Sequence, residues 1–217
     1  MSDPVSVVVF GATGTAGSAV VAQCLADERI AQVRAITRRP IGIGHPRLID
    51  IHCHDFSHPE SLAHQLTGVA ACFFCLGTSR RRAGSAVGYR EVTLTYPLVA
   101  ADILRERSPE HTFVHLSAAG AGPHGLFRYA RVKGEAETQL AGNGLRRLFV
   151  ARPGYIHPEP ERPAGALMRA VFPALNATLP GLAITATDLA RGMIEAALGD
   201  GEGRVLRTRD LKRLATR

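Results

Sequence analysis

The chain has 217 residues, 46% of them hydrophobic, and a mean hydropathy of +0.04. This length suits a single domain with a real core, and no apolar run approaches the length of a membrane span. The net charge of +7 comes almost wholly from arginines, which are spread along the chain without an aromatic-interleaved stripe, so we expect no nucleic-acid partner. No basic segment precedes the first apolar run, so we expect no signal peptide and a cytoplasmic protein.

The first predicted strand, residues 5–10, is an apolar run rich in β-branched residues. A G-x-x-G-x-x-G turn follows it, and residues 18–27 are predicted to be helical. Glycines between a strand and a helix let the backbone approach a diphosphate, which the helix N-terminus attracts. We therefore expect a dinucleotide here, a plain strand-to-helix turn being the alternative. The expected contact residues are Gly11, Thr13, Gly14, Thr15, Ala16 and Gly17.

The second predicted strand, residues 33–37, ends at Arg38 and Arg39 with no acidic residue. An NAD site usually places an acid at this point to bind the ribose 2′-hydroxyl, whereas arginine suits a 2′-phosphate. NADP(H) is therefore the expected cofactor, and two surface arginines at a strand end are the alternative.

Strands and helices continue to alternate, which predicts an α/β fold, a doubly wound parallel sheet of the Rossmann type. Further strands are expected at residues 47–53, 69–76, 112–116 and 145–151, with an edge strand at 204–206. Helices are expected at residues 57–65, 89–107, 127–141 and 188–198, the last capped by Thr187. Residues 77–88 are expected to form an arginine-rich loop.

After residue 154, prolines interrupt the alternation of strands and helices. We expect a dinucleotide-binding core at 1–154, a small proline-rich substrate lobe at 155–186, and a C-terminal part at 187–217 that completes the same domain. The lobe is predicted to hold a short helix at 166–175, and the basic tail 207–217 a solvated helix.

Four cysteines do not form a secreted disulfide framework in a chain of this size. Cys72 and Cys75 mimic a C-x-x-C motif, but on a strand they point to opposite faces, so we expect buried, reduced thiols. Histidines gather around Cys53 without the spacing of a zinc site, so no metal is expected.

Three polar residues suggest proton-transfer chemistry. Ser117 ends the fifth strand, at the edge where open α/β sheets bind ligands. Tyr129 and Lys133 are four residues apart on a predicted helix and share a face. A lysine cation lowers the pKa of a nearby phenol, which can then exchange a proton with a substrate oxygen that the serine holds.

These motifs, with Arg152-Pro153-Gly154, resemble those of the short-chain dehydrogenase/reductase superfamily in its extended or atypical form. The runs at 74–84 and 133–137 resemble the branch that contains the Tat-interacting tumour-suppressor oxidoreductase. The resemblance covers residues 5–198. Many members place Asn or Asp in the long helix after the fourth strand, where this chain has Val92-Thr93-Leu94-Thr95.

The resemblance implies further dinucleotide contacts around the cleft. Lys133 would hold the nicotinamide ribose, and Tyr129 would lie beside the cofactor. The other implied contacts are Asp55, Phe56, Leu76, Gly77, Thr78, Pro153 and Gly154.

The sequence favours an NADP(H)-dependent oxidoreductase acting on a small carbonyl or alcohol substrate. A non-catalytic NADP(H)-binding sensor or scaffold with a protein partner is the first alternative, and an NAD(P)-dependent epimerase or isomerase the second. A monomer or homodimer without a membrane span is expected.

Overall fold

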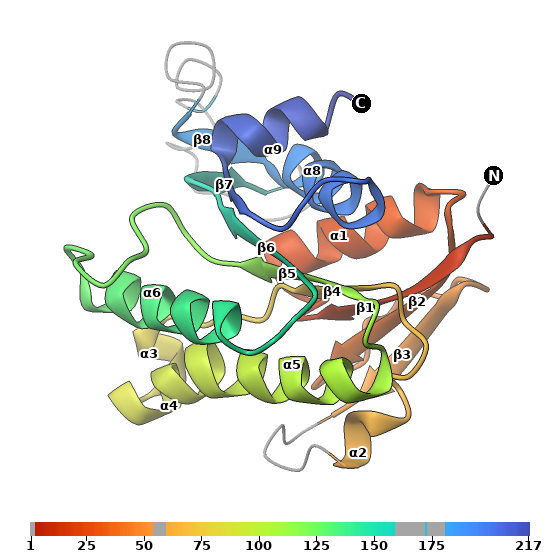
Figure 1. Ribbon diagram of the computed structural model, residues 1–217, viewed down its shortest axis with the longest axis horizontal. Coiled ribbons are helices and arrows are strands. Elements are labelled where there is room, and N and C mark those ends of the chain that lie inside the picture. The colour runs from red at the N-terminus through yellow and green to blue at the C-terminus, as the bar shows by residue number, and fades with distance from the viewer. Residues whose placement is uncertain (1–2, 54–59, 159–171, 173–180) are drawn as a thin grey trace.

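The computed structural model describes residues 3–53, 60–158, 172 and 181–217 as a central sheet between two layers of helices (Figure 1). The seven strands follow the order β3-β2-β1-β4-β5-β6-β9, and every neighbouring pair is parallel. They are β1 (Val5–Phe10), β2 (Ile30–Thr37), β3 (Leu48–His52), β4 (Ala71–Phe74), β5 (Thr112–Leu116), β6 (Arg147–Arg152) and β9 (Val205–Arg207). The predicted doubly wound α/β sheet is confirmed.

Helices cover both faces of this sheet, as Figure 1 shows. One face carries α1 (Thr15–Ala26), α8 (Ala186–Leu198) and α9 (Thr208–Leu214); the other carries α2 (Glu60–Ala63), α5 (Tyr96–Arg107) and α6 (Arg128–Ala141). Because successive side chains of a strand point to opposite faces of the sheet, the hydrophobic core consists of two clusters, one on each face. Val7 and Val9 pack into the cluster with α1 and α8, whereas Val8 and Phe10 pack into the cluster with α5. All four are fully buried.

The two cysteines of the C-x-x-C motif belong to different clusters. Cys72 packs on the α5 side of the sheet and Cys75 on the α1 side, and all four cysteines are buried and outside disulfides. Their predicted placement is confirmed. Within the described ranges no group of three His, Cys, Asp or Glu side chains could hold a metal ion, and His54 and His58 lie outside those ranges.

The segment after β4 differs from its prediction. The expected loop 77–88 contains a short helix, α3 (Arg80–Ala83), which Ser79 caps and which ends at Gly84, with φ +72°. The expected single helix 89–107 consists of α4 (Ala86–Arg90), a π-helical turn η1 (Glu91–Thr95) and α5. Ser85 accepts a hydrogen bond from Gly88 N, so the helical path begins three residues early.

The C-terminal region also departs from expectation. The tail helix α9 is packed rather than solvated, because Thr208 and Leu211 are buried and Gly192 of α8 leaves room for the Leu211 backbone. Thr185, not Thr187, caps α8 by accepting from Asp188 N at 3.0 Å. Two unpredicted strands, β7 (Tyr155–His157) and β8 (Ala183–Thr185), form a small parallel sheet. The helix expected at 166–175 lies outside the described residues except for Phe172.

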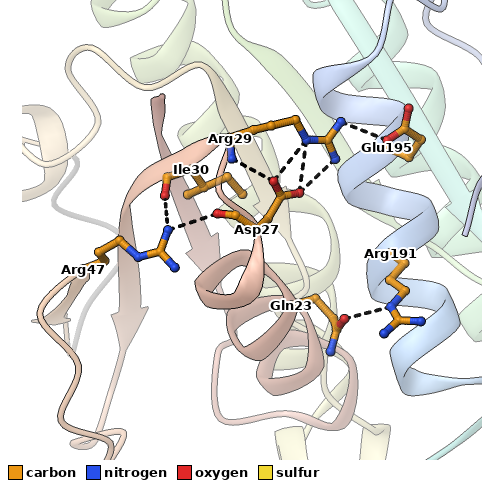
Figure 2. A network of polar contacts seen from close by, with 7 residues as sticks. All are labelled: Gln23, Asp27, Arg29, Ile30, Arg47, Arg191 and Glu195. Carbon is orange, nitrogen blue, oxygen red and sulfur yellow. Dashed lines mark hydrogen bonds and ion pairs between the residues drawn. The ribbon is translucent and has the colours of Figure 1, made fainter. Parts of the chain in front are cut away.

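A charged network fastens the amino-terminal edge of the sheet (Figure 2). Arg29 donates to both Asp27 carboxylate oxygens at 2.8–3.2 Å and to Glu195 of α8 at 3.0 Å. Arg47, which precedes β3, donates to the carbonyl oxygens of Asp27 and Ile30 at 3.0 and 2.6 Å. The network therefore joins α1, β2, the start of β3 and α8. None of the described helices is long and apolar enough to cross a membrane.

Candidate functional site

A cleft of about 650 Å³ lies at the carboxyl ends of β1, β2 and β4. Parallel strands bring the residues that follow them to one edge of a sheet, where α/β proteins bind ligands. The residues lining the cleft are Gly11, Thr13, Gly14, Ile36, Thr37, Arg38, Arg39, Pro40, Cys75, Leu76, Gly77 and Arg82. The structure thus brings the glycine turn, both arginines after β2 and the segment after β4 together.

The glycines of this turn are required by close backbone approach. Gly11 has φ +76°, and a Cβ on it would lie 2.7 Å from the Leu76 backbone. A Cβ on Gly17 would lie 2.2 Å from Gly11 O. Gly14 is the N-cap of α1, it has no side-chain cap, and its N–H donates to Gly11 O at 2.9 Å. Thr13 is exposed beside it, and Thr15 and Ala16 begin the helix, so free N–H groups of the first turn face a backbone cradle suited to a diphosphate.

The arginines after β2 lie on the wall of this cleft. Arg38 and Arg39 are exposed and form no ion pair with any described residue, and no carboxylate is among the residues lining the cleft. Asp50 of β3 is used internally: it accepts from Thr37 Oγ1 at 2.8 Å and from Ile41 N at 2.7 Å. Burial raises the pKa of this carboxyl, but these bonds outweigh burial and hold its pKa below the usual value. Asp50 therefore fixes the path of the arginine segment.

Ser117 is 5% exposed and donates a hydrogen bond to the carboxylate of Glu137 on α6. Arg152 at the end of β6 holds the same carboxylate, with its Nε 3.0 Å from each oxygen. Glu137 is only 7% exposed, so its charge is compensated by one arginine and one hydroxyl. The hydroxyl proton of Ser117 is committed to Glu137, which leaves its oxygen lone pairs as acceptors.

Lys133 lies close to this group and to His115. Lys133 Nζ donates to Leu116 O at 3.3 Å, and burial lowers the pKa of its ammonium to about 8, although Glu137 acts to raise it. His115 of β5 is 2% exposed, and neither ring nitrogen has a hydrogen-bond partner among the described residues. Burial, with a smaller contribution from Lys133, lowers the pKa of His115 to about 3, so the imidazole is neutral at physiological pH.

Tyr129 lies in the first turn of α6 and is 46% exposed. Its ring stacks on Phe127, with centroids 5.6 Å apart and planes at 9°. No hydrogen bond joins Tyr129 to Ser117 or Lys133, all three of which are described residues. The structure brings Ser117 and Lys133 to one buried cluster through Glu137 and Leu116, and leaves the phenol at the surface above it.

The remaining predicted site residues divide into three groups. Leu76 and Gly77 line the cleft, and Thr78 follows them. Pro153 O accepts from Ala119 N at 2.8 Å, which places Pro153 beside the loop after Ser117, and Gly154 N donates to Thr208 Oγ1, at the start of α9, at 3.0 Å. Asp55 and Phe56 lie outside the described residues.

Sequence reasoning missed three residues at this edge. Arg82 lines the cleft from α3, and the run Arg80-Arg81-Arg82 directly after a strand end was the available signal. Glu137 lies four residues after Lys133, a spacing that places both on one helix face. His115 alternates with buried apolar residues of β5 and carried no sequence signal of its own.

The chain matches a known family and has relatives of known name. The family model described as NAD(P)H-binding matches residues 11–199, which begin at the glycine turn. The chain is 30% identical to Protein HTATIP2 of Rattus norvegicus over 205 residues, which cover 92% of this chain and 84% of that protein. It is 29% identical to the mitochondrial protein fmp52 of Aspergillus clavatus over 211 residues, or 92% and 90% of the two chains. That name gives a mitochondrial location, so the cytoplasmic location expected here stays a prediction.

Solved structures show the same fold. A short-chain dehydrogenase from Burkholderia cenocepacia in complex with NADP superposes with a TM-score of 0.71 at 14% identity, covering 97% of this chain and 91% of that one. The Bordetella bronchiseptica enzyme WbmF in complex with NAD+ gives a TM-score of 0.69 at 18% identity, covering 99% and 77%.

Proposed function

The chain belongs to the NAD(P)H-binding family, and from that premise we propose that it is an NADP(H)-dependent oxidoreductase acting on a small carbonyl or alcohol compound. The observation that carries the cofactor choice is the pair Arg38 and Arg39, exposed and unpaired among described residues beside a cleft without an acid. Arginine guanidinium groups fit a 2′-phosphate through paired, charge-assisted hydrogen bonds.

When bound, the dinucleotide would supply a hydride donor or acceptor next to the substrate carbon. The Gly11–Gly17 turn would hold its diphosphate, and the Lys133 ammonium would hold ribose hydroxyls. Tyr129 would exchange a proton between its phenol oxygen and the substrate oxygen. Ser117, whose proton is donated to Glu137, would accept a hydrogen bond from an alcohol substrate; to hold a carbonyl oxygen its hydroxyl must turn away from Glu137.

The test of the cofactor choice is titration of NADPH and NADH into the wild type and into the double variant Arg38→Ala/Arg39→Ala. The wild type should prefer NADPH, and the variant should lose about tenfold or more in NADPH affinity while NADH binding changes little. Equal affinity of the wild type for both dinucleotides contradicts the proposal. Gly14→Val should abolish binding of either dinucleotide, because its side chain would enter the cradle.

The test of the reaction is a panel of carbonyl compounds assayed by NADPH consumption. With a substrate found in this way, Tyr129→Phe should lower turnover by roughly a hundredfold or more while NADPH affinity persists. Turnover that survives this substitution rules out the proposed acid–base role.

A second candidate is a protein that binds NADP(H) without catalysis and reports the redox state to a partner. The observation that favours it is the position of Tyr129, exposed on Phe127 and not bonded to Ser117 or Lys133. In that case Tyr129→Phe and Ser117→Ala should be silent in every assay, while Gly14→Val should abolish cofactor binding and partner response together.

A further inference from the structure

A second cavity, of about 250 Å³, lies beside Tyr129 and is separate from the dinucleotide cleft. Helix α3 contributes to both, with Arg80 on the small cavity and Arg82 on the cleft. The residues lining the small cavity are Arg80, Ala86, Tyr89, Arg90, Arg128, Tyr129, Arg131, Val132 and Glu135. It therefore borders the phenol proposed to act on the substrate, and its wall is unusually rich in arginine.

The charges on this wall do not cancel. Arg90 and Glu135 form a two-pronged ion pair, with N–O distances of 2.8 and 2.7 Å, which neutralises one arginine and the single carboxylate on the wall. Arg80, Arg128 and Arg131 are exposed and form no ion pair with any described residue. Three positive charges thus surround a hollow next to Tyr129.

The backbone at the start of α6 adds to the positive electrostatic potential in this cavity. Arg128 is the first residue of α6, a 14-residue helix whose N-cap Phe127 provides no side-chain cap. No acidic residue lies in the first turn, although acids are favoured there by the helix dipole. The unpaired N–H groups and the partial positive charge of this helix end act beside the cavity that Arg128 and Tyr129 line.

We propose that this cavity binds an anionic group, a carboxylate or a phosphate, of the substrate whose carbonyl or alcohol oxygen meets Tyr129. The inference rests on the proposed function in assigning Tyr129 its role, but the binding of the anion requires no turnover. Planar guanidinium groups recognise both kinds of anion through paired hydrogen bonds. A volume of 250 Å³ equals that of about eight water molecules, so the bound portion is small.

Isothermal titration calorimetry on the NADPH-saturated protein tests this, because saturation keeps anions out of the larger cleft. The probes are 4-oxopentanoate, its neutral amide 4-oxopentanamide, and inorganic phosphate. We expect 4-oxopentanoate to bind about tenfold or more tightly than the amide, the scale of a charged hydrogen bond. Phosphate should compete with it. Tighter binding of 4-oxopentanoate than of phosphate supports a carboxylate substrate, and the reverse supports a phosphorylated one.

Two variants locate the site. Arg128→Gln and Arg131→Gln should each weaken 4-oxopentanoate binding by about tenfold, whereas Arg213→Gln, an exposed arginine on α9, should leave it unchanged. Equal binding of the acid and the amide, or wild-type affinity in the Arg128→Gln/Arg131→Gln double variant, overturns the proposal and leaves a merely solvated arginine surface. If no carbonyl compound consumes NADPH, the oxidoreductase proposal fails, while these binding results still decide the anion site.

Discussion

The two edges of the sheet handle charge in opposite ways. At the amino-terminal edge, the Arg29 side chain is 50% exposed, and its ion-pair partners Asp27 and Glu195 are 18% and 24% exposed (Figure 2). At the carboxyl-terminal edge, Glu137 is 7% exposed and is held by Arg152 and Ser117. Water screens the Arg29 ion pairs, so breaking them costs little in the free energy of unfolding. The second set depends on its own partners, because a buried charge without one is costly.

The same contrast appears in the titration of the two edges. Hydrogen bonds from Arg29 lower the pKa of Asp27, the ordinary result for a paired carboxylate. Burial instead lowers the pKa of Lys133 to about 8 and that of His115 to about 3. Shifts that come from desolvation near a ligand cleft are typical of functional sites. The edge that carries the cleft at the glycine turn is therefore also the edge where burial shifts the pKa values of ionisable groups.

The largest effect should come from removing the carboxylate at the buried edge. Glu137→Ala leaves the Arg152 guanidinium without its ion-pair partner and Ser117 without its acceptor. We expect a loss of about 3 kcal/mol in the free energy of unfolding, as for other broken buried pairs. Urea unfolding measures it, with Glu137→Gln as the control, because the amide oxygen can still accept from Ser117. A loss below about 1 kcal/mol would mean that the two edges do not differ in this respect.

The comparison of the two edges can also be tested by the pH dependence of stability, to which His115 contributes. Its folded-state pKa of about 3 lies below the unfolded value of about 6.5, so the unfolded chain takes up the proton first as pH falls. Stability from this group is therefore lost as pH falls from about 6.5 toward 3, with a slope of up to about 1.4 kcal/mol per pH unit.

His115→Phe should remove this slope between pH 6 and pH 5, where most carboxylates are still ionised. The free energy of unfolding by urea at several pH values gives the slope, and the exposed His124→Gln variant is the matched control. A slope that is unchanged in His115→Phe contradicts the assignment.

The sequence predicted the elements that burial and tight turns dictate. The bounds of β1, an almost wholly apolar run, and of β5 were predicted to the residue, and the demand for close backbone approach identified Gly11, Gly14 and Gly17. The sequence did not predict β7 and β8, because three residues are too few to show a strand pattern. It also did not predict the early helical turns after β4, which begin at the serine caps of α3 and α4.

The sequence predicted which residues belong to the candidate site, but not which side chains contact one another there. Spacing placed Tyr129 and Lys133 on one face of α6, but spacing does not fix side-chain rotamers. The phenol ring lies on Phe127 and the ammonium bonds to Leu116. The bond from Ser117 to Glu137 and the ion pair with Arg152 join three separate elements, so only the folded chain reveals them.

Lys133→Met should separate stability from function. The folded-state pKa of about 8 lies below the unfolded value of about 10.4, so burying the ammonium costs stability in full below pH 8, and that cost is relieved as pH rises from about 8 toward 10.4. We expect the variant to be more stable by about 1 kcal/mol at pH 7, a gain that shrinks by pH 9.5. NADPH affinity should fall in the same variant, since the proposed ribose contact is lost. Thermal unfolding at both pH values and NADPH titration measure the two effects, and a destabilised variant at pH 7 contradicts the first.

The smallest effect should come from the partly exposed network of Figure 2. Arg29→Gln removes the ion pairs with Asp27 and Glu195, but the arginine is half exposed and water replaces its partners. We expect a loss of less than about 1 kcal/mol in the free energy of unfolding, shrinking further between 0.05 and 1 M salt because the Debye length falls to about 3 Å. Urea unfolding at the two salt concentrations measures it beside Glu137→Ala, whose loss should persist at high salt because burial shields the pair from ions. If Arg29→Gln costs as much as Glu137→Ala, burial is not what distinguishes the two edges.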